Sequence, residues 1–197
     1  MTTKNSKIVF GIIASLFLVF YFLRLCSGIF KIADSFEYLS TSETLKKGMF
    51  FIQSNDFMNA EAATKRPILY PIFLLVNSMV NIKVVIFIQT LFGILNTYMI
   101  LKCIEKLKIT IHNYIILIVL NTPSIFIYTQ LIMSEWLVMT LVLVMTYTFL
   151  YEFTKKRFLL IQILTILLAL TKPVFFPIIY FNFIYFAIFL YRKKIFS

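Results

Sequence analysis

Long apolar runs separated by basic clusters constrain this chain more than any other feature of its sequence. The clearest run, Val84 to Leu101, has 18 residues without a charge and is followed by Lys102, Lys106 and Lys108. A helix of that length rises about 27 Å, close to the roughly 30 Å hydrocarbon core of a bilayer. Only 14% of the residues are charged and 61% are hydrophobic, whereas a soluble domain is about one-quarter charged. The sequence therefore predicts an integral membrane protein.

The basic clusters set the expected topology, because Lys and Arg favour the cytoplasmic ends of membrane spans. Ile68 to Val80 has only 13 residues, so we expect a partial or re-entrant helix there. With both termini in the cytoplasm, residues 31–66 form the first extracytoplasmic loop. The predicted fold is an all-α, polytopic membrane bundle forming one module, 1–197, of about six spans. These spans are Ile8 to Phe30, Val84 to Leu101, Ile111 to Thr129 (broken at Asn121 to Pro123), Trp136 to Tyr151, Phe158 to Thr171 and Val174 to Tyr191.

The first apolar run resembles a signal peptide in having Lys4 and Lys7 before it. No small-residue cleavage site follows, so we expect an uncleaved first span. Arg24 lies a turn or two from the outer end of that span. Its side chain can reach the interface or face a cavity within the protein.

Several other functions are disfavoured by the sequence. The net charge of +11 is spread over short clusters between apolar runs, so no nucleic-acid-binding domain is predicted. The two cysteines, Cys26 and Cys103, are expected near opposite membrane faces, which disfavours a disulfide between them. The sole histidine, His112, is expected at an interface without a catalytic role. Polar residues within the spans are too few and scattered to favour a transporter.

The one long polar interruption runs from Asp34 to Pro71 and carries most of the acidic residues. Asp34 and Glu37 have the spacing of a capping box, and Gly48 follows two lysines as a helix stop. The segment therefore predicts a short interfacial helix with Phe36 and Leu39 toward the membrane surface. It contains five of the eight acids in the chain: Asp34, Glu37, Glu43, Asp56 and Glu61.

Four short motifs in order give a resemblance to a known family. They are Asp34-Ser-Phe-Glu-Tyr38, Arg66-Pro-Ile-Leu-Tyr70-Pro71, Leu131-Ile-Met-Ser-Glu135-Trp136 and Leu170-Thr-Lys172-Pro173. Together they resemble the GT-C membrane glycosyltransferases, in particular the protein O-mannosyltransferases and the aminoarabinose transferases of lipid A. Those enzymes transfer a sugar from a polyprenyl-phosphate carrier to an acceptor outside the cytoplasm. The resemblance spans roughly residues 8 to 191 and implies a bacterial or archaeal cell membrane.

The resemblance implies a role for each matching residue. Asp34 and Glu135 are the candidate catalytic acids, and they are also the candidate ligands if a divalent metal ion is bound. Lys65 stands where some relatives carry an acid, which leaves metal or acceptor coordination at that position open. No other cofactor is expected. The candidate substrate- and phosphate-binding residues are Arg66, Tyr70, Lys172 and Tyr38.

Each of these residues also has a structural interpretation that the sequence leaves open. Asp34 can be a helix cap, and Glu135 can begin a helix where its charge suits the helix dipole. Lys172 and Arg66 can extend to the interface, and Tyr70 can belong to an interfacial aromatic belt.

The chain has about half the spans of a typical member of this family. We therefore expect either a short enzyme or a module that needs a partner membrane protein to supply the missing helices. The alternative hypothesis is a non-catalytic membrane subunit or degenerate relative that binds a lipid carrier or a partner protein. In both cases the expected ligands are membrane lipid and a polyprenyl-phosphate-linked sugar or its carrier.

Overall fold

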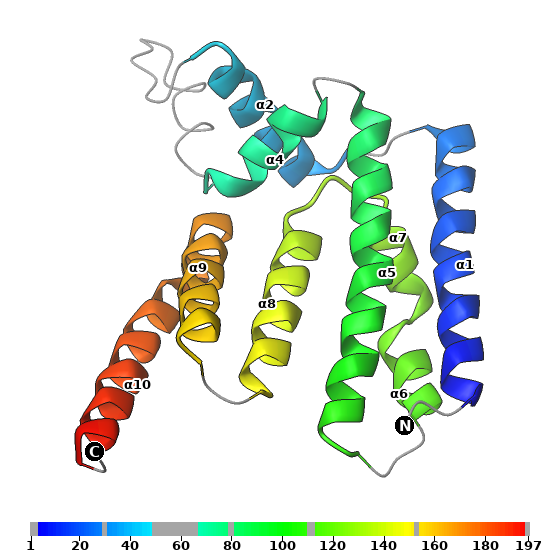
Figure 1. Cartoon of the computed structure of the whole chain (residues 1–197). Coiled ribbons are helices and arrows are strands. Elements are labelled where there is room, and N and C mark those ends of the chain that lie inside the picture. The colour runs from blue at the N-terminus through cyan, green and yellow to red at the C-terminus, as the bar shows by residue number, and fades with distance from the viewer. Residues whose placement is uncertain are drawn as a thin grey trace.

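The computed structural model of the chain describes residues 4–28, 31–48, 67–78, 81–109, 113–151 and 154–195. The regular secondary structure in these ranges is helical and contains no strand, which confirms the all-α prediction (Figure 1). The helices are α1 (Lys4–Ser27), α2 (Ala33–Lys46), α4 (Leu69–Ser78), α5 (Ile82–Lys106), α6 (Asn113–Leu120), α7 (Pro123–Tyr128), α8 (Glu135–Phe149), α9 (Lys155–Thr171), the 3-10 turn η1 (Pro173–Phe175) and α10 (Phe176–Ile195).

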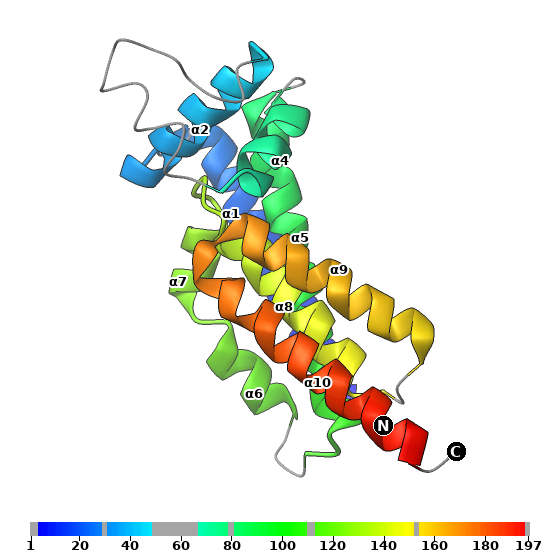
Figure 2. The ribbon, with the colours of Figure 1, turned by 90° about the vertical axis from the view of Figure 1, so that its left-hand side faces the viewer.

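The longer helices run alongside one another, whereas α2 and α4 lie together at one end of the bundle (Figures 1 and 2). We call this the α2–α4 end. Both termini lie at the opposite end, so α1 runs toward the α2–α4 end and α5 runs away from it. The α6–α7 pair, α8, α9 and α10 then continue to alternate in direction. Segments that are far apart in the sequence, including the starts of α2 and α8, therefore meet at the α2–α4 end.

Among the described residues, two helices are long and apolar enough to cross a membrane. They are α1, with 24 residues, and α5, with 25 residues. Two shorter apolar helical stretches lie at Glu135–Phe149 and Pro173–Ala187. The predicted run before α5 is a helix of only 10 residues, α4, in agreement with an incomplete span. The structure therefore gives a helical protein with two candidate membrane helices, and six spans stay a prediction.

Local sequence signals explain several helix ends. Gly28 and Gly48 have φ of 85° and 74°, the left-handed conformation that favours glycine after a helix. The predicted stop at Gly48 is therefore confirmed. The predicted break at Asn121 to Pro123 is also confirmed, because α6 ends at Leu120 and α7 begins at Pro123. Proline suits the first position of α7, where its missing N–H leaves no hydrogen bond unmade.

The predicted capping box at the start of α2 is wrong. The helix begins at Ala33, so Ile32 takes the capping position and Asp34 lies inside the first turn. The Ile32 N–H donates to the Ser35 hydroxyl at 3.2 Å. Ser35, and not Glu37, therefore closes the turn. The capping-box pattern predicted that the helix would begin after Asp34. The helix instead begins one residue before Asp34, at Ala33.

The interior of the bundle combines apolar packing with many buried polar groups. Phe17 of α1 is fully buried and packs edge-on against Phe126 and Trp136, with ring centroids 4.6 Å and 6.3 Å away. A Cβ atom built on Gly93 of α5 would lie 2.6 Å from Cε1 of Phe17, so α1 and α5 approach closely there. Small residues permit such approaches between helices in membranes. Buried polar side chains include Gln89, Thr90, Asn96, Thr97, Thr129, Gln130, Thr165, Thr171 and Asn182.

The outer surface of the bundle is rich in large apolar side chains. They line much of α1, α9 and α10, with Val174, Tyr180 and Phe181 among the most exposed. A soluble protein rarely exposes contiguous apolar surface on this scale. Polar groups inside and apolar groups outside are the arrangement that a lipid environment favours, because lipid cannot hydrogen-bond to exposed polar groups.

Candidate functional site

Five of the six predicted site residues lie at the α2–α4 end, and four of them form a cluster there. Tyr38 comes from α2, Tyr70 from α4, Glu135 from the first residue of α8, and Lys172 from the residue after α9. The rings of Tyr38 and Tyr70 meet edge-on with centroids 4.7 Å apart. Glu135 lies close enough to Tyr70 to affect its ionisation. We call these four residues, together with Ser134, the Glu135 cluster.

Glu135 and Lys172 form an ion pair. The Lys172 ammonium donates to Oε1 of Glu135 at 2.6 Å, joining the start of α8 to the end of α9. The two side chains are 44% and 32% exposed, so the pair is open to one side. The second oxygen, Oε2, is inaccessible and has no hydrogen-bond partner within the described residues. One oxygen of this carboxylate is thus paired with Lys172, and the other is a buried acceptor without a donor among the described residues.

The structural interpretation of Glu135 is also confirmed. Glu135 is the first residue of α8, where a negative charge interacts favourably with the partial positive charge of the helix N-terminus. Lys172, by contrast, pairs with Glu135 instead of simply extending to an interface. The Glu135–Lys172 pair can stabilise the fold and also take part in a reaction, because both roles require the two charges to be held at this end of the bundle.

Tyr38 and Ser35 connect α2 to the segment before α8. The Tyr38 hydroxyl shares a hydrogen bond of 2.8 Å with the Ser134 hydroxyl. One helical turn earlier, the Ser35 hydroxyl donates to the backbone oxygen of Ile132 at 3.1 Å. All of these groups are buried. Together the two bonds hold the residue before Glu135 against α2, and thereby fix where α8 begins.

Tyr70 is held by a second polar group, Gln89 of α5. The Tyr70 hydroxyl donates to Oε1 of Gln89 at 2.9 Å. The Gln89 amide in turn donates to the backbone oxygens of Thr129 and Leu131, at 3.2 Å and 2.6 Å. The aromatic-belt interpretation of Tyr70 is therefore wrong, because its ring is buried and its hydroxyl bonds to protein.

The environment of Tyr70 keeps its phenol neutral. Burial raises the pKa of Tyr70 well above its usual value, and the proximity of Tyr38 and Glu135 raises it further. The backbone of Met133 partly opposes this shift of the pKa. Tyr70 is therefore a hydrogen-bond donor at neutral pH. Any contact with a ligand would require its hydroxyl to exchange the bond to Gln89.

Asp34 lies one turn before Tyr38 on the same face of α2 and is half-buried. Its interpretation as the helix cap is wrong, because Ile32 takes the capping position and Asp34 is the second residue of α2. The remaining predicted binding residue, Arg66, lies outside the described residues, as do Lys65 and His112.

The described residues do not assemble a metal site. Within them, no three His, Cys, Asp or Glu side chains come together. Oε1 of Glu135, a predicted ligand, is already paired with Lys172. The described donors therefore do not fit a divalent ion, and a metal stays an implication of the family resemblance.

An apolar groove adjoins Glu135. It has a volume of about 250 Å³ and lies between α7 and α8. Glu135 is its only charged residue, so a carboxylate stands at the edge of an otherwise apolar surface. The groove is lined by Ile125, Tyr128, Met133, Glu135, Trp136 and Met139.

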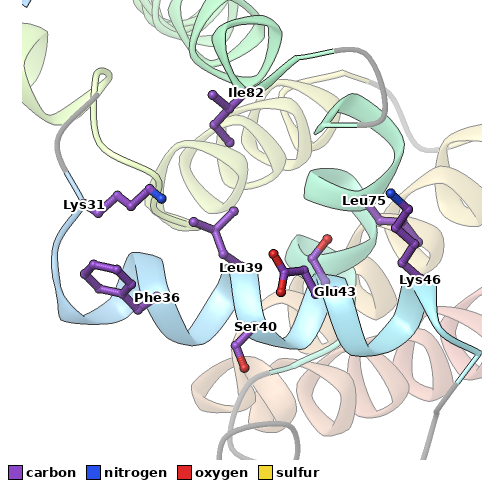
Figure 3. Close-up of a pocket in the computed structure, with 9 residues that line it drawn as sticks. Lys31, Phe36, Leu39, Ser40, Glu43, Lys46, Leu75 and Ile82 are labelled. Atoms are coloured by element: carbon purple, nitrogen blue, oxygen red, sulfur yellow. The ribbon is translucent and has the colours of Figure 1, made fainter. Parts of the chain in front are cut away.

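A larger cavity of about 490 Å³ lies between α2, α4 and the start of α5 (Figure 3). Its wall carries Lys31, Glu43 and Lys46 beside apolar side chains. The Lys31 ammonium lies 5.8 Å from the centre of the Phe36 ring. Among the described residues, no predicted site residue lines this cavity, so the resemblance assigns it no role. Phe36 and Leu39, expected to face the membrane surface, contribute to its wall.

Sequence reasoning missed the residues that hold the Glu135 cluster together. Gln89 had a usable signal, because an amide within an 18-residue uncharged run needs a hydrogen-bond partner. Ser134 had the weaker signal of standing next to Glu135. Ser35 had none, since its bond to the backbone oxygen of Ile132 depends on a residue 97 positions away.

No protein-family model, curated protein or solved structure matches the chain. The family resemblance therefore rests on the four short motifs alone.

Proposed function

We propose that the chain is a GT-C-like membrane glycosyltransferase module that transfers a sugar from a polyprenyl-phosphate carrier to an acceptor outside the cytoplasm. The observation that carries this proposal is the Glu135–Lys172 pair at the edge of an apolar groove. A carrier lipid needs such a combination, because its phosphate requires a cation and its chain requires an apolar surface.

The proposed reaction needs one proton acceptor and one cation. An acceptor hydroxyl attacks the anomeric carbon of the sugar, and its proton passes to the carboxylate of Asp34. The bond between that carbon and the phosphate oxygen breaks, and polyprenyl phosphate leaves with the electron pair. Lys172 and Arg66 stabilise the negative charge on the departing phosphate. Glu135 positions Lys172 through their ion pair.

The proposal includes the six-span topology with both termini in the cytoplasm. The alternating helix directions support it, as does the basic character of the end opposite α2 and α4 (Figure 1). At that end the Lys106 ammonium and the Arg157 guanidinium lie 4.3 Å and 4.7 Å from the centre of the Tyr151 ring. Basic groups gathered on an interfacial aromatic are typical of a cytoplasmic membrane boundary. The Glu135 cluster then lies outside the cytoplasm.

A second candidate function is favoured by the exposed apolar surface of α10. A helix that packs along one side only can receive helices from a partner membrane protein. In that role the chain is a non-catalytic subunit, and the Glu135–Lys172 pair is a structural link between α8 and α9.

Sugar transfer by the purified chain in lipid nanodiscs distinguishes the two functions. The substrates are radiolabelled polyprenyl-phosphate sugars, and the chains are wild type, Asp34→Asn and Glu135→Gln. We expect Asp34→Asn to lower turnover at least about 100-fold, the usual effect of losing a general base. Glu135→Gln should also lower turnover, because Lys172 loses the charge that positions it. Glu37→Gln removes a carboxylate from the same helix and should leave turnover unchanged. Full activity in both site variants would refute the proposed mechanism, and an inactive, folded wild type would favour the subunit.

The single tryptophan provides a separate test of carrier binding. Trp136 lines the groove beside Glu135, so a brominated polyprenyl phosphate bound there should quench its fluorescence. Brominated phosphatidylcholine at the same bromine content is the control. Stronger quenching by the polyprenyl phosphate supports carrier binding, whereas equal quenching by the two lipids contradicts it.

A further inference from the structure

A second groove lies between the end of α1 and the α7 region, apart from the Glu135 cluster. It has a volume of about 350 Å³. Ile127 of α7 faces this groove, whereas Ile125 and Tyr128 face the groove beside Glu135, so α7 lies between the two. The lining residues are Phe20, Leu23, Arg24, Ser27, Ile32, Ile127, Gln130 and Leu131.

Arg24 supplies the positive charge of this groove. It lies three residues before the end of α1 and is only 9% exposed. Its guanidinium has several donors in a planar array, a geometry that matches the oxygens of a phosphate.

Gln130 supplies a hydrogen-bond acceptor, and its amide orientation follows from its neighbours. The Thr90 and Thr129 hydroxyls donate to the backbone oxygens of Ile86 and Phe126. Each hydroxyl has one proton, so each must accept when it bonds to Gln130. The Gln130 NH₂ group therefore points at both hydroxyls, at 3.3 Å and 2.8 Å.

This orientation leaves Oε1 of Gln130 without a donor. The atom is buried and has no hydrogen-bond partner among the described residues, and the side chain is only 4% exposed. A buried acceptor without a partner destabilises the folded chain, so a ligand hydroxyl that reached it would be favoured.

We propose that this groove binds an anionic phospholipid with a hydroxylated headgroup. The phosphate bonds to Arg24, a headgroup hydroxyl donates to Oε1 of Gln130, and an acyl chain lies along Phe20, Leu23 and Leu131. Among the described residues that line the groove, Arg24 is the one cation and none is acidic, so a lipid with net negative charge complements it better than a zwitterionic lipid does. This proposal goes beyond sugar transfer and does not depend on it.

Native mass spectrometry of the full chain in detergent tests the proposal directly. The probes are dilauroyl phosphatidylglycerol and dilauroyl phosphatidylcholine, titrated separately. Loss of a charge-assisted hydrogen bond corresponds to about tenfold in affinity. We therefore expect Arg24→Gln to weaken phosphatidylglycerol binding about tenfold. Lys83→Gln is the matched control, because Lys83 is exposed at the same end of the bundle and does not line the groove.

A second pair of variants tests the groove itself without altering charge. Leu23 and Phe22 are both well exposed on α1, but only Leu23 lines the groove. Leu23→Trp should fill the groove and weaken phosphatidylglycerol binding several-fold, whereas Phe22→Trp should not. Equal binding of the two lipids by the wild type would overturn the proposal. Equal losses in Arg24→Gln and Lys83→Gln, or in the two tryptophan variants, would also overturn it.

Discussion

Helices α5 and α10 are both strongly apolar, yet the structure uses them in opposite ways. Half of the most apolar window of α5 is buried by α1, α4, α6 and α8. Among the side chains of α10 that the structure describes, only Asn182 is buried. Hydrophobicity therefore does not decide which helix forms the centre of this bundle.

Packing features explain the difference between the two helices. In lipid, apolar burial gives little driving force, so helices associate through close contact and hydrogen bonds. Helix α5 offers Gly93 for contact with Phe17, and Gln89 and Thr97 for hydrogen bonds to other helices. Helix α10 offers mainly large aromatic side chains, which suit a surface facing lipid or a partner.

The largest expected effect comes from removing an aromatic ring at the bundle centre, compared with removing one from α10. Phe17→Ala should lower the free energy of unfolding by about 3 kcal/mol, because the ring is fully buried between two aromatic rings and leaves a cavity. Phe181→Ala on α10 should cost less than about 0.5 kcal/mol, since its ring is 70% exposed. Unfolding by sodium dodecyl sulfate, followed by circular dichroism, measures both. Similar costs would mean that α10 is packed as tightly as the bundle centre.

Adding one methyl group tests the close approach of α1 and α5. Gly93→Ala should destabilise the protein by about 1–3 kcal/mol, because the new Cβ overlaps the Phe17 ring. Gly11→Ala is the matched control, since a Cβ there meets open space and alanine is the better helix former. It should be neutral or stabilise by up to about 1 kcal/mol. Phe17→Leu should partly restore the stability of Gly93→Ala if the overlap is the cause.

The hydrogen bond between Tyr70 and Gln89 should give α5 a pH-dependent contribution to stability. Tyr70→Phe leaves Oε1 of Gln89 without its donor and should cost about 1–3 kcal/mol at neutral pH. The folded state raises the pKa of Tyr70, so its contribution is complete below the usual tyrosine pKa. The contribution is lost as the pH rises above about 10, because the unfolded chain then releases the proton first.

The corresponding measurement is the stability difference between wild type and Tyr70→Phe at about pH 8 and about pH 11. The difference should shrink at the higher pH. Tyr180→Phe on α10 is the control, because the Tyr180 ring is exposed and should contribute little at either pH. A pH-independent difference for Tyr70→Phe would contradict the assignment.

The smallest expected effect concerns the buried polar contact that the described side chains of α10 make. Asn182 donates to the Thr165 hydroxyl of α9. Asn182→Leu should cost about 0.6 kcal/mol, the average for hydrogen bonds between membrane helices. A double-mutant cycle with Thr165→Val isolates the coupling energy between Asn182 and Thr165. A coupling energy of several kcal/mol would show that α10 is fixed by this bond and is not a loosely packed edge.

The sequence motifs predicted which residues belong to the site better than they predicted the contacts that these residues make. The motifs identified Tyr38, Tyr70, Glu135 and Lys172, and the structure brings them to the same end of the bundle. They could not show that Lys172 pairs with Glu135, because the two residues are 37 positions apart. Nor could they show that Tyr70 is buried, since a tyrosine near an apolar run is equally suited to an interface. The role of these residues in sugar transfer stays a proposal.

The sequence by itself determined the helical class, the short α4, the break before Pro123 and the stop at Gly48. These features depend on local composition, on helix length and on the conformational preferences of glycine and proline. Tertiary structure alone decided that α5 lies at the centre and α10 at the edge, and that Ser35, Gln89 and Gln130 make their contacts. The physical reason is that steric fit and hydrogen bonding between distant helices depend on positions that no local pattern encodes.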